Sequence, residues 1–187
     1  MCFSAEASFA ASAALAASSV AIARIPKEKA AIPLSLFPAV FSLHQFTEGL
    51  IWLNQDGILP DAYEPAVVTT YALIAYALWP AFVPLAAFLI ETDKRRRAIL
   101  LACQAIGLCG SLGLLASLAR NPVVVSADCC SLSYSVSAPA FLTAPYLVAT
   151  CLPFLVSSRR SLVLFGVGLS ASCAAAALSS LVMFLVE

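Results

Sequence analysis

The residues with the clearest potential for chemistry lie together at positions 44–52, in the stretch HQFTEGLIW. This stretch holds the only histidine of the chain, His44, with Gln45 and Glu48 close by. At 3.6 residues per turn, the three side chains fall within an arc of about 100° on one helix face. We call these three residues the polar ridge. A carboxylate and an imidazole on one face can bind a proton or a cation, and they can equally hydrogen-bond to neighbouring helices.

The polar ridge lies in a segment long enough to cross a bilayer. Of the 187 residues, 62% are hydrophobic and 11% are charged, whereas soluble domains carry about 25% charged residues. A spanning helix needs about 20 mainly apolar residues. Six segments meet this requirement: 4–24, 31–53, 66–90, 98–119, 138–157 and 161–186. The sequence therefore predicts one all-α membrane domain over residues 1–187, an integral bundle of six transmembrane helices.

The basic residues predict the orientation of this bundle. Of the ten Lys and Arg residues, all but Arg120 fall in the connections that follow the first, third and fifth spans. The positive-inside rule places these connections in the cytoplasm, so the N-terminus and the C-terminus are both expected outside. The longest outer connection, 120–137, contains VVV and LSYSV around SADCCS. This pattern favours a small β-hairpin, with a disordered loop as the alternative.

In this orientation, Glu48 lies about 8 Å below the outer end of its span and His44 about 6 Å deeper, at 1.5 Å per residue. A carboxylate at that depth costs a few kcal/mol unless it is protonated, paired, bound to a cation or in contact with water. One hypothesis is a structural clamp in which the polar ridge bonds to Thr70 and Tyr71 of the next span. A second is a binding or conduction site for a proton, a cation or a small solute.

A third hypothesis is a metal site, because Glu48 and His44 are four residues apart and can both reach one ion. Glu6 or Cys2 from the same outer side would complete it. The cysteines also allow a disulfide, since Cys2, Cys129 and Cys130 all map to the outer face. If that face is oxidising, a bridge from Cys2 to either of the other two would tie the N-terminus to the outer connection.

Small residues and prolines predict how the spans pack. Ser4, Ser8, Ser12 and Ala16 recur every four residues in the first span, and GLCGSLG (107–113) lies in the fourth. Such small residues let helices approach closely in lipid, so both segments are expected to be contact faces. Three other spans carry two prolines each, which free backbone carbonyls and can kink the helices: Pro33 and Pro38, Pro80 and Pro84, Pro145 and Pro153.

Two motifs carry a resemblance to known proteins. The chain opens MCFSAEASF, and its second span reads IPLSLFPAVFSLHQFTEGLIWL. It resembles a family of small bacterial multi-spanning membrane proteins without an assigned function, which share Met-Cys-Phe-Ser-Ala-x-Ala-Ser-Phe and then Gln-x-x-Glu-Gly-x-x-Trp. The second motif corresponds here to Gln45, Glu48, Gly49 and Trp52, and it leaves out His44. The resemblance implies a multi-pass protein of the bacterial inner (plasma) membrane.

Together these observations favour a protein that binds or transports a small solute or ion at a polar site centred on Glu48. The alternative is a structural or assembly subunit without a substrate, and the third candidate is an enzyme acting on a lipid or a quinone. No hydrolase or nucleotide-binding fingerprint is present, so an enzyme is not favoured and no cofactor is predicted. The expected partners are the lipid bilayer and a small solute or ion, with a homo-oligomer left open. The net charge of zero gives no indication of nucleic-acid binding.

Overall fold

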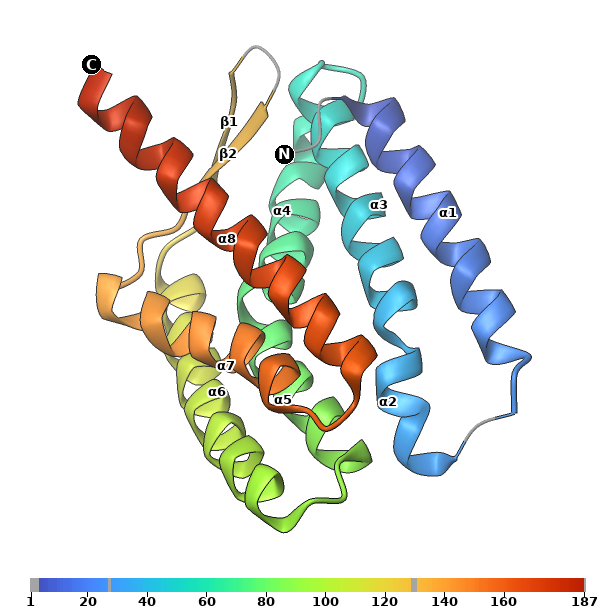
Figure 1. The fold of residues 1–187 in the computed structure, drawn as a ribbon. Coiled ribbons are helices and arrows are strands. Elements are labelled where there is room, and N and C mark those ends of the chain that lie inside the picture. The colour runs from blue at the N-terminus through green and yellow to red at the C-terminus, as the bar shows by residue number, and fades with distance from the viewer. Residues whose placement is uncertain (1–3, 27, 129–130, 187) are drawn as a thin grey trace.

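The chain folds almost entirely into helices in the computed structural model, which describes residues 4–26, 28–128 and 131–186 (Figure 1). In chain order the main elements are α1 (Ala5–Ala23), α2 (Ile32–Ser35), α3 (Phe37–Gln55), α4 (Glu64–Ala72), α5 (Trp79–Ile90), α6 (Lys94–Arg120), β1 (Val124–Asp128), β2 (Ser131–Ser135), α7 (Thr143–Val156) and α8 (Arg160–Val186). Short 3₁₀ turns, η1 (Lys29–Ala31), η2 (Asp61–Tyr63) and η4 (Ala140–Leu142), and a π-helical turn, η3 (Leu73–Leu78), join some of them.

Six helical segments correspond to the six predicted spans, and α7 and α8 are inclined to the others (Figure 1). By length and composition, four of them are apolar enough to cross a membrane: Ala5–Ala23, Lys29–Gln55, Asp61–Ile90 and Lys94–Arg120. Ala140–Val156 and the part Arg160–Ala176 of α8 are apolar but shorter. Figure 1 shows the start of α1, the β1–β2 hairpin and the end of α8 at one end of the bundle, which we call the hairpin end. The α1–α2 and α5–α6 connections lie at the opposite, basic end.

The middle of the predicted stripe of small residues on α1 is a helix contact face. Ser8 and Ser12 are buried, whereas Ser4 is half-buried and Ala16 is exposed, and α1 lies alongside α3 (Figure 1). The hydroxyl of Ser12 donates to the carbonyl of Ser42 at 2.9 Å, and the hydroxyl of Ser42 donates to the carbonyl of Ser12 at 2.9 Å. Each helix thus satisfies a polar group of the other, which holds the two backbones close together. This contact fixes α3, and with it the polar ridge.

The prolines divide the second segment into α2 and α3 and follow a π-helical turn in the third, but α5 and α7 continue through Pro84 and Pro153. Pro33 and Pro38 stand in the first turns of α2 and α3, and the π-helical turn η3 is followed by Pro80 and Pro84 in α5. A π-helical turn and prolines leave backbone carbonyls without their usual helical partners. Side chains of α6 and α7 donate to three carbonyls in this region: Tyr146 to Ala75 at 2.9 Å, Ser111 to Ala77 at 2.7 Å, and Gln104 to Ala81 at 3.1 Å. The irregular backbone is therefore satisfied inside the protein.

The connection 120–137 forms the β-hairpin that the sequence left open beside a disordered loop. Strand β1 pairs with β2 in an antiparallel register that runs from Val124 opposite Ser135 to Asp128 opposite Ser131. The serines of β2 are exposed, whereas Leu132 is buried and Tyr134 is half-buried. Since alternate residues of a strand face opposite sides, Leu132 and Tyr134 share one face. That face packs on the hydrophobic cluster that α3 and α4 form at the hairpin end.

Candidate functional site

The polar ridge lies where α3 approaches α4 and the hairpin, with Glu48 buried and His44 and Gln45 half-buried. α3 begins at a proline-containing turn and continues without interruption to Gln55, so His44, Gln45 and Glu48 keep their predicted common face. Glu48 is only 4% exposed. Its Oε2 accepts a hydrogen bond of 3.0 Å from Nε2 of Gln45. Among the described residues, Glu48 forms no salt bridge, and its hydrogen-bond partner is this neutral amide.

Three stacked rings cover this ridge. The imidazole of His44 lies against the ring of Tyr71, with centroids 4.3 Å apart and planes inclined at 31°. The ring of Tyr134 from β2 also stacks on Tyr71. The two ring centroids are 4.3 Å apart, and the planes are nearly parallel, at 12°. A residue of the hairpin therefore completes the cover over a helix that lies far away in the sequence.

Several polar atoms in this region are buried without a hydrogen-bond partner among the described residues. They include Nε2 of His44, Nε1 of Trp52 and the hydroxyl of Tyr134. Trp52 is one turn beyond Glu48 on α3 and belongs to the same hydrophobic cluster as Tyr71 and Tyr134. Buried polar atoms in proteins nearly always have a partner, which can be an ordered water or a bound ligand. The ridge therefore has unused hydrogen-bonding capacity around a buried carboxylate.

The electrostatic setting keeps the Tyr134 phenol neutral. Burial raises its pKa well above the ordinary value of 10, and the neighbouring Tyr71 and Glu48 raise it further because a second negative charge is unfavourable there. The hydroxyl of Tyr134 is thus a hydrogen-bond donor at every physiological pH. Donor groups near a carboxylate stabilise its charged form and can also bind the oxygen of a small solute.

The structure brings together Glu48, Gln45, His44 and Tyr71 but leaves Thr70 outside this group. Thr70 is exposed, and its hydroxyl donates to the carbonyl of Ala66 on its own helix at 2.8 Å. The reason is geometric, since neighbouring residues of a helix point about 100° apart. Tyr134, which sequence reasoning did not include, joins the group instead through its ring contact with Tyr71. The alternation of LSYSV was the signal that could have found it.

The remaining candidate residues are those of the predicted metal site and the cysteines. Within the described parts of the chain, no three His, Cys, Asp or Glu side chains come close enough to hold a metal ion, and Glu6 is exposed. The proposed disulfide of Cys2 with Cys129 or Cys130 lies outside the described residues. Of the cysteines in the spans, Cys103 is buried as a small apolar residue, while Cys109 is exposed.

Comparison with known proteins supports a family assignment. No curated protein and no solved structure matches the chain. A family of unknown function, DUF6629, matches residues 1–186. Because the match extends over nearly the whole length, the chain belongs to the DUF6629 family.

Proposed function

We propose that this chain is a bacterial inner-membrane protein with six transmembrane helices and both termini outside, which binds a proton, a cation or a small solute at the polar ridge. The alternating helix directions and the basic residues of alternate connections support this orientation. In it, the hairpin covers the outer end of the bundle. The polar ridge then lies in the outer half of the membrane, beneath Tyr134.

The observation that carries this proposal is the buried carboxylate of Glu48 with its incomplete set of partners. A charge in the hydrocarbon region costs a few kcal/mol even on the more lenient scales. Gln45 supplies one neutral hydrogen bond, which offsets part of that cost. A proton or a cation would remove the rest, and the unpartnered atoms of His44 and Tyr134 could hold the solvent or solute that comes with it.

A second candidate function is supported by the cover over the ridge. Glu48 is almost inaccessible, and the rings of His44, Tyr71 and Tyr134 are stacked, as expected for a clamp that only joins α3, α4 and the hairpin. A clamp predicts that added ions leave the Glu48 carboxyl group unchanged. The two candidates therefore differ in an observable property of a single carboxyl group.

We expect that Glu48→Gln abolishes an infrared band from a protonated carboxyl that changes with pH and with added Na⁺, K⁺ or Ca²⁺. The measurement is infrared difference spectroscopy of the full chain in lipid nanodiscs, with deuterium exchange to identify the band. Asp56→Asn is the matched control, because Asp56 is exposed at the end of the same helix. This control should keep the response. A carboxyl band that is constant over pH and ion content would support the clamp instead.

Tyr134→Phe is expected to lower the free energy of unfolding by about 1 kcal/mol, the typical net value of one hydrogen bond. The phenylalanine keeps the ring stack with Tyr71 and removes only the hydroxyl. If the site holds solvent or a solute, that hydroxyl has a partner to lose. In a sealed clamp the hydroxyl is an unsatisfied buried group, so the same variant would be more stable than the wild type. Denaturation in mixed micelles measures the sign.

A further inference from the structure

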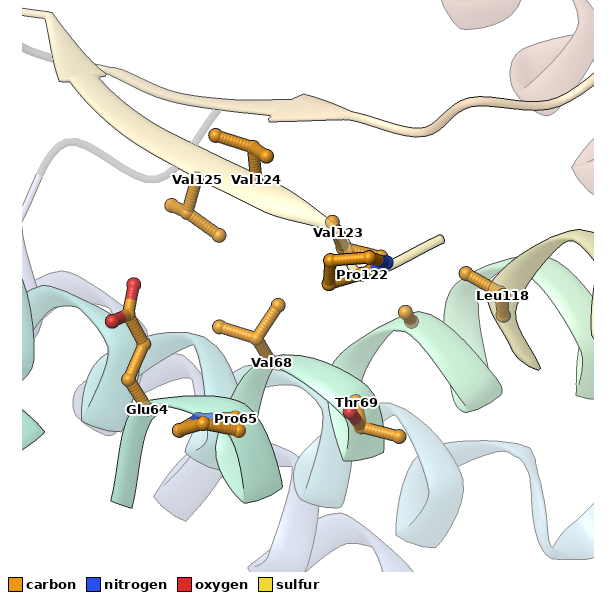
Figure 2. A pocket seen from close by; sticks show the side chains of 10 residues that line it. Glu64, Pro65, Val68, Thr69, Leu118, Pro122, Val123, Val124 and Val125 are labelled. Atoms are coloured by element: carbon orange, nitrogen blue, oxygen red, sulfur yellow. The ribbon is translucent and has the colours of Figure 1, made fainter. Parts of the chain in front are cut away.

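A cavity separate from the polar ridge lies between the first turns of α4, the end of α6 and strand β1 (Figure 2). Its volume is about 300 Å³, which is within the range of small-molecule sites. Val68 and Ala72 of α4 form its floor, and Leu118, Val123 and Val125 are among the residues that close it from the other sides. Apart from Glu64 and the hydroxyl of Thr69, the side chains that line it are apolar.

The polarity of this cavity changes along its length. Glu64, the first residue of α4, places its carboxylate at one end, directed toward β1 (Figure 2). No hydrogen bond or salt bridge to this carboxylate is found among the described residues. From Glu64 to Ala72 the helix advances about 12 Å into the bundle, and this part of the wall is mainly apolar. The cavity thus offers one negative charge at the surface and a hydrocarbon lining below it.

The charge of this cavity lies at one end only. Leu118 and Pro122, from the end of α6 and the residues after it, line the part away from Glu64 (Figure 2). Among the residues that line the cavity, Glu64 is the charged one. A carboxylate at one end of an apolar slot matches the positively charged group of a lipid headgroup with an attached acyl chain.

We propose that this cavity binds a phospholipid with a primary ammonium headgroup, phosphatidylethanolamine, with the ammonium at Glu64 and an acyl chain along Val68, Ala72 and Leu118. A primary ammonium can donate hydrogen bonds to a carboxylate, whereas the quaternary ammonium of phosphatidylcholine cannot. The order of polar and apolar groups is that of a lipid at a membrane surface. The proposal requires the segment Asp61–Ile90 to cross the membrane, and it does not depend on the Glu48 site.

Native mass spectrometry of the full chain, released from detergent with equal amounts of phosphatidylethanolamine, phosphatidylcholine and phosphatidylglycerol, tests this proposal. The wild type is expected to retain phosphatidylethanolamine in excess. Glu64→Gln should reduce that excess about fivefold, which corresponds to about 1 kcal/mol for a partly exposed ion pair. Asp61→Asn is the matched control, because Asp61 is an exposed acid three residues away that does not line the cavity.

A second variant tests the place of the acyl chain. Thr69→Phe puts a large ring at an exposed lining position and should reduce retention of all three lipids at this site. Equal retention of phosphatidylethanolamine and phosphatidylcholine by the wild type would overturn the proposal, and so would an unchanged preference in Glu64→Gln. Neither outcome would bear on Glu48, because its carboxyl band is measured independently.

Discussion

Gly107→Ala is expected to destabilise the protein by about 3 kcal/mol or more, at the upper end of the effects of overpacking a core. A Cβ atom added at Gly107 would lie 1.9 Å from the carbonyl oxygen of Pro80 and 2.9 Å from its carbonyl carbon. Both atoms belong to backbone, so no side chain can rotate away. α6 would have to move away from α5, which would disturb the nearby hydrogen bonds from Ser111 and Gln104 to the carbonyls of Ala77 and Ala81.

Gly168→Ala is the matched control for this prediction. Gly168 also lies in the middle of a long helix, α8, but a Cβ atom added there meets no atom within 4 Å. Alanine favours a helix over glycine by up to about 1 kcal/mol, so this variant should be as stable as the wild type or slightly more stable. Unfolding in mixed detergent micelles compares the two variants directly. Equal stability of Gly107→Ala and Gly168→Ala would show that the α5–α6 contact is not tight.

The close contact at Gly107 illustrates what could be predicted from the sequence. GLCGSLG indicated a contact face, and Gly107 and Gly110 are indeed buried. The sequence does not reveal which glycine is indispensable, because that depends on its partner. The partner is the carbonyl of Pro80, which Pro84 leaves without its helical hydrogen bond. The contact involves Pro80 and Pro84 in one span and Gly107 in another, and only the packing of the two helices brings these residues together.

The candidate site shows the same limit. Helical periodicity placed His44, Gln45 and Glu48 on one face, and the depth of Glu48 pointed to Tyr71 in the next span. Periodicity could not place Tyr134, because its contact depends on how the hairpin folds back over the helices. The face on which a residue lies within one helix follows from the helical repeat. Contacts between distant elements depend on the geometry of their connections, which a single sequence does not specify.

Glu91→Gln is expected to destabilise the protein by about 3 kcal/mol, as for hydrogen bonds to a charged group. Glu91 follows the third predicted span (66–90) as the C-cap residue of α5, and it is only 2% exposed. Its Oε1 accepts hydrogen bonds from the backbone amides of Thr92 (2.9 Å) and Asp93 (3.1 Å), and its Oε2 accepts one from Ser158 (2.7 Å). The carboxylate thus joins the α5–α6 connection to the α7–α8 connection. A glutamine would turn an NH₂ group toward amide hydrogens.

Arg96 also joins the α5–α6 connection to the end of α7. Nη1 of Arg96 donates to the carbonyls of Val156 and Ser157 at the end of α7, at 2.6 and 2.7 Å. Asp93→Asn is the control for Glu91→Gln, because Asp93 is an acid in the same connection whose side chain caps α6. Asparagine caps a helix about as well as aspartate, so this control should stay within about 0.5 kcal/mol of the wild type. A similar loss in both variants would mean that charge alone matters at this end.

The effect of Glu91 is expected to depend on pH in a defined direction. Burial acts to raise the pKa of its carboxyl, but the hydrogen bonds from Ser158, Asp93 and Thr92 outweigh burial and lower the pKa from its ordinary value of 4.5 to about 2. Because the folded pKa is below the unfolded one, the contribution to stability is complete above pH 4.5 and is lost as the pH falls toward 2.

Wild type and Glu91→Gln should therefore differ in unfolding free energy by a constant amount at neutral pH and converge in acid. Within the window between the two pKa values, the wild type should lose up to about 1.4 kcal/mol per pH unit from this one group. The measurement is a series of unfolding titrations in a detergent without ionisable groups. Curves that stay parallel down to pH 2 would contradict the assigned hydrogen bonds. Convergence would show that a single carboxylate joins the two helix pairs at the basic end of the bundle.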